Sequence, residues 1–179
     1  MNKSVGETLV DLVRDRRGES NIGDLIADAM REHAGADIAF HNGGGIRADI
    51  YRGPVTAGAI FSALPFENVL TSVDLTGAQV LEVLQHGFSG GHGAVQLSGI
   101  RVHKRGGVLE ATIGGKPLEE GRVYRVVTND FMAAGGDGYE TFKNGRNTTY
   151  GDLLRDVVSR HIHTHSPIRR ELDGRIRID

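Results

Sequence analysis

Apolar side chains recur at the spacing of an amphipathic helix in four stretches of the chain. Several of these stretches follow a Ser, Thr or Asn, which can cap the first turn of a helix by accepting a hydrogen bond from a backbone N–H. Residues 5–17 are ambiguous, since a short helix and an extended strand both fit their pattern. The predicted helices are 22–30 with Ser20 or Asn21 as the cap, 57–64 behind Thr56, a helix after Thr76 with Val80, Leu81, Leu84 and Phe88 on one face, and 148–161.

Short runs of apolar, often β-branched residues separate these helices and predict strands. The run at 108–113 is followed by Gly114 and Gly115, a pair typical of a hairpin turn. Because helices and strands interleave without a strict βαβ repeat, we expect an α+β fold with helices packed on a mixed β-sheet. The predicted strands are 38–40, 69–75, 94–102, 108–113, 123–128 and 175–178.

Length and composition restrict the class of protein. The 179 residues suit a single domain over 1–179, which is large enough to bury a substantial core. A net charge of −2 argues against bulk electrostatic binding to nucleic acid or to an anionic membrane. The chain has no cysteine, which excludes disulfides and thiolate chemistry, and it has no apolar run near the ~20 residues of a membrane span.

The loop from His41 to Arg47 is the clearest candidate for a small-molecule site. It follows a predicted buried strand and begins with Asn42, whose amide offers two donors and one acceptor. Gly43–Gly45 have no Cβ, so a ligand can touch the backbone, and the planar guanidinium of Arg47 suits phosphate or carboxylate. A tight turn with a surface arginine fits the same residues equally well.

Two aromatic residues and one acidic residue extend this hypothesis. Phe66 and Phe131 each lie at the end of an apolar element beside Pro or Gly, where exposed rings could clamp a flat ligand from two sides. Their position alone favours core packing, which is the usual fate of Phe. Asp137 lies between glycines after a predicted strand, and it is either a ligand for sugar hydroxyls or an ordinary turn aspartate.

Two further clusters have less definite meanings. Arg14, Arg16 and Arg17 crowd before Glu19, where they are either solvated charge or ligands for an anion. Histidines at 161, 163 and 165 would share one face of a strand, but the run follows a predicted helix and precedes a proline. We therefore expect no metal site in this chain, and a metal enzyme built on these histidines is only a remote alternative.

No catalytic motif appears along the sequence. The chain lacks a G-x-S-x-G nucleophile elbow, a G-x-x-x-x-G-K-[ST] phosphate loop and an H-E-x-x-H zinc motif. No cluster of Asp, His and Asn suits two metal ions. The residues therefore indicate a binding surface and assign no catalytic residue.

Four motifs, in one order, resemble the C-terminal domain of the 5′-nucleotidase family, which includes a periplasmic UDP-sugar hydrolase and the vertebrate ecto-5′-nucleotidase. Each motif alone is weak, but together they extend the resemblance over about residues 5–178. The motifs are Glu19–Leu25, Asn42–Arg47, Leu64–Phe66 and Asn129–Tyr139.

The resemblance implies that this domain binds the substrate nucleoside, with the base sandwiched between Phe66 and Phe131. Of the crowded arginines, Arg16 fits a family position by its spacing before Glu19, whereas Arg14 and Arg17 fit none. The other implied substrate contacts are Asn42 with the base edge, Asp137 with the ribose hydroxyls, Arg16 and Arg47 with the phosphates, and Gly44 in the substrate-binding loop.

In that family, a separate N-terminal metallophosphoesterase domain hydrolyses the substrate with two divalent metal ions. None of its motifs occurs here, so we expect this chain to hold no cofactor and to be inactive without that partner domain. The first residues contain no stretch of signal-peptide length, which indicates a cytosolic protein or a piece of a longer one.

The resemblance implies that the full-length protein is secreted, periplasmic or on the cell surface. It leaves the substrate open, since relatives act on nucleoside monophosphates, UDP-sugars, 2′,3′-cyclic nucleotides or NAD-like dinucleotides. The alternative is a stand-alone nucleotide-binding or nucleoside-binding module without a role in hydrolysis.

Overall fold

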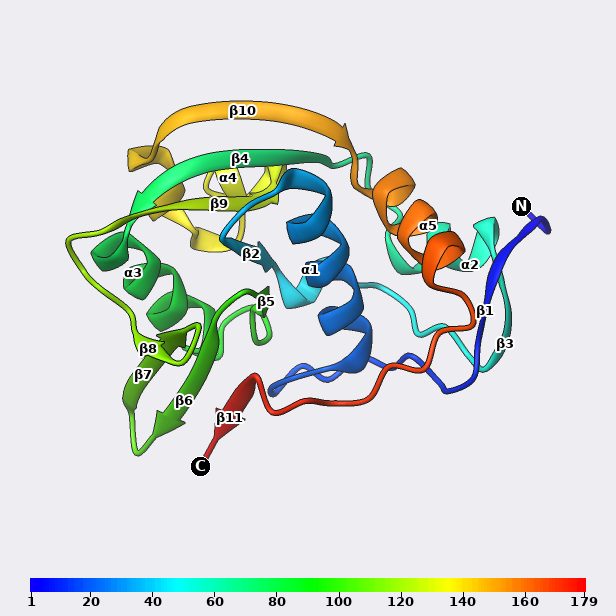
Figure 1. Cartoon of the computed structure of the whole chain (residues 1–179), viewed down its shortest axis with the longest axis horizontal. Coiled ribbons are helices and arrows are strands. Elements are labelled where there is room, and N and C mark those ends of the chain that lie inside the picture. Colours follow the sequence, from blue (N-terminus) through cyan, green and yellow to red (C-terminus); the bar gives the residue numbers. More distant parts are fainter.

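The centre of the molecule is a mixed sheet of five strands, and the computed structural model describes every residue from Met1 to Asp179 (Figure 1). Its strands are β2 (Ile38–His41), β4 (Val69–Thr76), β5 (Gln96–Ser98), β9 (Val123–Asn129) and β10 (Arg146–Leu153). They lie in the order β10-β4-β9-β2-β5, with β2 and β9 parallel and the other neighbours antiparallel.

Alternate residues of the central strands point to opposite faces of the sheet, and each face has its own core. Ala39 on β2 belongs to the core that also contains residues of three helices, α1 (Asn21–Ala34), α2 (Ala57–Ala63) and α5 (Leu154–His165). Its neighbours Ile38 and Phe40 belong to the opposite core, with α3 (Gly77–Gly87) and α4 (Asp130–Ala133). The predicted α+β fold, with helices packed on a mixed sheet, is confirmed.

Side-chain caps explain where three predicted helices begin. Ser20 Oγ accepts a hydrogen bond from Gly23 N–H at the start of α1, and Thr56 caps α2 in the same way. At the start of α3, Thr76 and Gln79 bond reciprocally to each other's backbone N–H and form a capping box. The sequence prediction of these starts is confirmed.

A second sheet of four strands lies beside the first, and the C-terminus joins it (Figure 1). It contains β6 (Arg101–Arg105), β7 (Val108–Ile113), β8 (Lys116–Pro117) and β11 (Ile176–Ile178), in the order β11-β6-β7-β8. Ile113 pairs with Lys116, so the predicted hairpin turn is confirmed. A further pair of strands, β1 (Ser4–Thr8) and β3 (Gly53–Thr56), runs antiparallel beside α2.

Two predicted elements have the wrong limits. The predicted strand 94–102 is broken because Gly99 has φ of 82° and packs so closely that an added Cβ would lie 2.0 Å from a backbone oxygen of Asp37. The predicted helix 148–161 begins only at Leu154, because the residues before it form the edge strand β10. The ambiguous residues 5–17 contain part of β1 and no helix.

The histidine run lies inside α5 and does not trail it, since that helix ends at His165. Short 3-10 helices complete the fold at η1 (Gly43–Gly45), η2 (Gly136–Gly138) and η3 (Glu140–Asn144). None of the helices combines the length and the apolar character needed to cross a bilayer.

Candidate functional site

The candidate site lies where the parallel strands β2 and β9 end. Asn42 follows β2, and Asn129 is the last residue of β9. Asn129 accepts a hydrogen bond from Met132 N–H (2.8 Å) and donates its amide N–H to Asn42 Oδ1 (2.9 Å). Because both asparagines are buried, this bond fixes the Asn42 amide so that Nδ2 donates to Asp137 Oδ2 (3.1 Å).

Asp137 is held in an unusual backbone conformation at the rim of the site. Its φ is 57°, a left-handed value that is uncommon outside glycine. The ring of His86 supports this turn, because its Nε2 lies 2.6 Å from the Asp137 carbonyl oxygen. One carboxylate oxygen is bonded to Asn42, and the other lies 3.7 Å from Nδ1 of the exposed His92. The carboxylate is therefore fixed in position while remaining in contact with solvent.

Phe66 and Phe131 both line one pocket of about 290 Å³, which we call the ring pocket. Their exposed fractions are 50% and 44%, so neither ring is part of a core, and the core packing that position alone favours is wrong. The ring pocket is lined by Asn42, Gly44, Gly45, Arg47, Phe66, Asn68, Phe131 and Asp137.

The two rings are supported by backbone contacts outside the pocket. A Cβ added to Gly136 would lie 2.6 Å from three atoms of the Phe131 ring, so this ring rests directly on the glycine backbone. On the other side, Arg155 donates to the carbonyl oxygens of Leu64 (3.0 Å) and Phe66 (3.3 Å). These contacts hold the two aromatic residues on separate turns, one after α2 and one within α4.

The glycine loop packs too tightly for side chains. A Cβ on Gly43 would lie 2.4 Å from Ala94 O, and one on Gly45 would lie 2.9 Å from the His41 ring. Gly44 is half-buried and lines the ring pocket, as expected for backbone that a ligand can approach. The loop is therefore a tight turn and also part of the pocket wall, so the two sequence interpretations are not exclusive.

A second pocket of about 330 Å³ adjoins the ring pocket and shares Gly44 and Arg47 with it. We call it the arginine pocket, and Arg14, Arg16 and Arg47 line it together with Asp15, Ser20, Gly43, Gly44, Ile46, Asp49 and Gln96. Arg14 is paired with Asp49 (2.9 Å), whereas the arginine ion pairs of the chain include neither Arg16 nor Arg47. Two exposed cations therefore lack an internal counter-charge beside the ring pocket.

Gln96 holds the backbone that carries Arg16. The glutamine is buried, and its Oε1 accepts hydrogen bonds from Ser20 N–H and Oγ–H (both 3.1 Å). Its Nε2 donates to Gly18 O (2.9 Å) and to Ala94 O (3.1 Å). The segment before α1 is thereby fixed against the segment before β5, which places Arg16 at the pocket.

His41 lies behind the glycine loop and takes no part in the pocket surface. It is completely buried, and neither ring nitrogen has a hydrogen-bond partner. Burial lowers the pKa of His41 to about 4, so the ring is neutral at physiological pH. Burial also raises the pKa of Tyr139 above its ordinary value, and the nearby Asp137 carboxylate adds to this. Both residues act as packing groups.

Two groups of side chains outside the pockets have the spacing of metal ligands. The carboxylates of Glu19, Asp24 and Asp173 lie together, but the guanidinium of Arg175 already supplies the positive charge there. Glu32, His161 and His165 form the second group, between α1 and α5. Burial, aided by the neighbouring His165, lowers the pKa of His161 below its ordinary value.

The structure thus brings every residue predicted for the site to the two adjoining pockets, with Arg16 in the arginine pocket and the others around the ring pocket. No sequence pattern predicts the residues that hold this site, chiefly Asn129, Gly136 and Gln96. Asn129 and Gly136 fall within a motif that was noted, but their roles depend on contacts across the chain. The pockets offer aromatic faces, fixed polar groups and free positive charge.

Comparison with known proteins gives a consistent result. Residues 4–144 match the family model described as 5′-nucleotidase, C-terminal domain. The chain is 41% identical, over 98% of its length, to the trifunctional nucleotide phosphoesterase protein YfkN of Bacillus subtilis. It is 36% identical, over 73% of its length, to the cell wall protein Lmo0130 of Listeria monocytogenes.

A solved structure, that of a 5′-nucleotidase precursor from Thermus thermophilus, superposes with a TM-score of 0.91 at 34% identity over 98% of this chain. The match covers 39% of the Thermus chain. The corresponding shares of the Bacillus and Listeria proteins are 14% and 19%, so this chain spans well under half of each relative.

Proposed function

Because this chain belongs to the 5′-nucleotidase C-terminal domain family, we propose that it binds a nucleotide, with the nucleoside in the ring pocket and the phosphate in the arginine pocket. One observation carries the proposal. Two exposed phenyl rings and a fixed Asn–Asp pair line a pocket that shares a wall with a second pocket containing unpaired arginines. A nucleotide has matching parts in the same order, namely a flat base for the rings, a sugar diol for the Asn–Asp pair and an anionic phosphate for the arginines.

The ring pocket supplies the contacts that a nucleoside requires. Phe66 and Phe131 stack on the base from two sides, and stacking on an aromatic side chain contributes about 1–3 kcal/mol per base. Asn42 offers its amide to the base edge. The Asp137 carboxylate accepts hydrogen bonds from the ribose hydroxyls, as acidic residues do in other nucleotide-binding folds.

The arginine pocket supplies the contacts for phosphate. Arg16 and Arg47 carry planar guanidinium groups that bind phosphate oxygens in pairs. Asp15 and Asp49 also line this pocket, but Asp49 is paired with Arg14, and neither Arg16 nor Arg47 forms an ion pair within the chain. Gly44 lies on the wall between the two pockets, where its backbone can approach the sugar or the phosphate. A phosphate bound there leaves the 5′ position of the ribose near the shared wall.

We propose further that residues 1–179 form one substrate-binding domain of a longer hydrolase. An N-terminal metallophosphoesterase domain would supply two divalent metal ions and the activated water. The residues of the two pockets here do not fit a metal pair, because positive arginines dominate one and amides and aromatic rings dominate the other. This chain therefore contributes binding and orientation, and no hydrolytic step is assigned to it.

The substrate class that we propose is a nucleoside 5′-monophosphate. UDP-sugars, cyclic nucleotides and dinucleotides contain the same base, ribose and phosphate, and two phenyl rings accept any base because every base has a π-face. A relative named as a cell wall protein supports a location outside the cytoplasm for the full-length protein. The absence of cysteine is compatible with an oxidising compartment.

Calorimetric titration with adenosine and AMP tests the binding proposal. We expect Phe131→Ala to weaken adenosine binding by roughly 5- to 150-fold, which corresponds to the loss of about 1–3 kcal/mol of stacking. Tyr150→Ala is the matched control, because Tyr150 is an exposed aromatic residue on β10 that lines neither pocket. Equal adenosine affinity in the Phe131 variant and the natural chain would refute the assignment of the base site.

A phosphate-release assay tests the second part. We expect the chain mixed with AMP and Mg²⁺, Mn²⁺ or Zn²⁺ to release no phosphate above background, and release to begin when an N-terminal metallophosphoesterase domain is fused to it. Phosphate release by the chain alone would place catalysis in this domain. Binding without release in the fused protein would favour a stand-alone nucleotide-binding module.

A further inference from the structure

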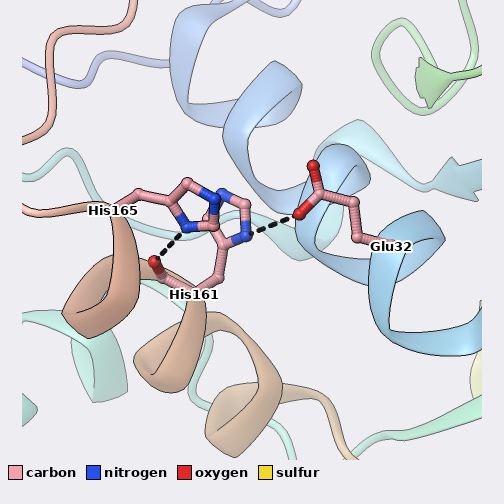
Figure 2. A group of neighbouring side chains, drawn as sticks. All are labelled: Glu32, His161 and His165. Atoms are coloured by element: carbon pink, nitrogen blue, oxygen red, sulfur yellow. Dashed lines mark hydrogen bonds and ion pairs between the residues drawn. The ribbon is translucent and has the colours of Figure 1, made fainter.

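Three potential metal ligands meet between the C-terminal ends of α1 and α5. Figure 2 shows Glu32 on α1 facing His161 and His165 on α5. The two histidines are four residues apart in the same helix and therefore share one face, which residue 163 does not. Their rings stack with centroids 4.0 Å apart and an angle of 24° between their planes.

The hydrogen bonds of these side chains leave ligand atoms available. Nδ1 of His165 lies 2.8 Å from the carbonyl oxygen of His161, so Nδ1 carries the proton and the Nε2 lone pair is free. This arrangement is the usual one for metal-binding histidines, whose second nitrogen donates to a carbonyl or carboxylate. Nδ1 of His161 lies 3.3 Å from Glu32 Oε2, which holds the carboxylate beside the rings.

We propose that Glu32, His161 and His165 bind one divalent transition-metal ion, for which Zn²⁺ is the best fit. One ligand atom from each residue lies within 4.8 Å of the others. An ion with bonds of about 2.0–2.1 Å needs its ligand atoms about 3.4 Å apart in a tetrahedral arrangement. Glu32 and His165 are exposed and can close this gap by rotation, while the buried His161 fixes the position of the site.

The chemistry of the ligands selects the class of metal. Two imidazoles and one carboxylate suit zinc and similar ions, whereas Mg²⁺ and Ca²⁺ prefer oxygen ligands. The nearby positive charge of Arg170 is already paired with Asp28 at 2.7 Å, so it does not oppose a cation strongly. Water completes the coordination, because the glutamate side is open to solvent.

The position of the ion indicates a structural role. None of the three ligands lines the ring pocket or the arginine pocket. An ion bound here would cross-link α1 to α5, which pack on the same face of the central sheet. Since the unfolded chain does not hold the three ligands together, the ion would stabilise the folded state by mass action. The proposal departs from our expectation of no metal in this chain, which rested on the histidine run following the predicted helix 148–161 and preceding a proline.

Equilibrium dialysis of the chelator-treated chain against ZnCl₂ tests the proposal. We expect one Zn²⁺ per chain, and binding at least about 10- to 100-fold weaker in Glu32→Gln and His165→Gln, since losing even an outer-shell partner of a metal ligand costs that much. Both residues are exposed, so both variants should fold. His163→Gln is the matched control, because that imidazole lies on the same helix with its Nδ1 near Val5 O, and its zinc affinity should not change. The midpoint temperature of thermal unfolding should rise by about 5–10 °C at zinc concentrations near one hundred times Kd. The Glu32→Gln and His165→Gln variants should not show this rise.

Two results would overturn the proposal. Zinc binding that falls equally in His163→Gln and His165→Gln would indicate non-specific binding to surface histidines. A chain that binds less than one Zn²⁺ at about 100 μM free metal, while showing native circular dichroism, would have no such site.

Discussion

Arg175 with its carboxylate partners and the pair Arg16 and Arg47 both lie near the start of α1, and the two sets use positive charge in opposite ways. In the first, Arg175 is buried and its guanidinium contacts Asp28 at 2.7 Å and Asp173 at 2.8 Å, with Asp24 at 3.2 Å. In the second, Arg16 and Arg47 are exposed at the arginine pocket and pair with no carboxylate. We call Arg175 and its carboxylate partners the closed group, because the chain itself supplies the counter-charges. We call Arg16 and Arg47 the open group, because their charge is available to another molecule.

The comparison shows that the number of arginines does not distinguish a binding site from a structural cluster. What distinguishes them is whether the chain itself supplies the counter-charges and removes them from water. A buried arginine surrounded by carboxylates holds distant segments together, because removing any one partner leaves an uncompensated charge. An exposed arginine without a partner costs the fold little and can bind an anion strongly.

The first family motif, Glu19–Leu25, belongs largely to the closed group. Glu19 is buried, and its carboxylate accepts hydrogen bonds from the backbone N–H groups of Asp173 (2.9 Å) and Gly174 (3.0 Å). Asn21 donates to Asp11 O and to Arg170 O. The motif therefore joins the start of α1 to both ends of the chain, and it does not line the ring pocket.

The largest effect should follow from opening the closed group. We expect Arg175→Ala to lower the free energy of unfolding by about 3–5 kcal/mol, because it leaves the ionised carboxylate of Asp28 on α1 without its cation. Urea denaturation measures this change. The matched variant Arg16→Ala should change stability by no more than about 0.5 kcal/mol. Similar losses in the two variants would remove the distinction drawn here.

Most of the fold could be predicted because its signals are local. Helix caps at Ser20, Thr56 and Thr76 and the apolar period behind them identify α1, α2 and α3 from neighbouring residues alone. The errors arose where distant contacts decide the structure. Gly99 breaks a strand because the backbone of Asp37 approaches it closely, and no local pattern records this.

The site could be predicted only in part for the same reason. The sequence marked Phe66 and Phe131, yet their positions alone favoured the core, and only the family resemblance indicated a clamp. The residues that hold the rings, such as Gly136 and Arg155, act through contacts that no spacing reveals. The roles proposed for the marked residues stay predictions until ligand binding is measured.

The next effect concerns a proton in the closed group. Burial, with the adjacent Glu19 carboxylate, raises the pKa of Asp24 to about 9, whereas its ordinary value is 3.8. Between these two values the folded state keeps a proton that the unfolded state has lost. The stabilisation from this proton is therefore fully present below pH 3.8. Above that pH, the free energy of unfolding falls by up to about 1.4 kcal/mol per pH unit as the pH rises towards 9.

Denaturation of the natural chain and of Asp24→Asn at pH 7.0 and 8.5 measures this dependence. The asparagine has the shape of the protonated carboxyl group but cannot titrate, so the variant should lose the dependence. Taking the difference between the two chains removes the contribution of the histidines. Equal pH dependence in the natural chain and the variant over this range would show that Asp24 is already ionised in the folded state at pH 7, which contradicts the prediction.

The smallest effect should come from the open group, and it should appear only with a charged ligand. We expect Arg16→Gln to weaken AMP binding by about fivefold, since a charge-assisted contact with phosphate at an exposed site contributes about 1 kcal/mol. Adenosine affinity and stability should not change, because Arg16 lines the arginine pocket and not the ring pocket. Arg17→Gln is the matched control. It removes the same charge from the neighbouring residue, whose side chain lines neither pocket. If both variants weaken AMP binding equally, the contribution is long-range attraction, which added salt would screen, and Arg16 makes no specific contact with the phosphate.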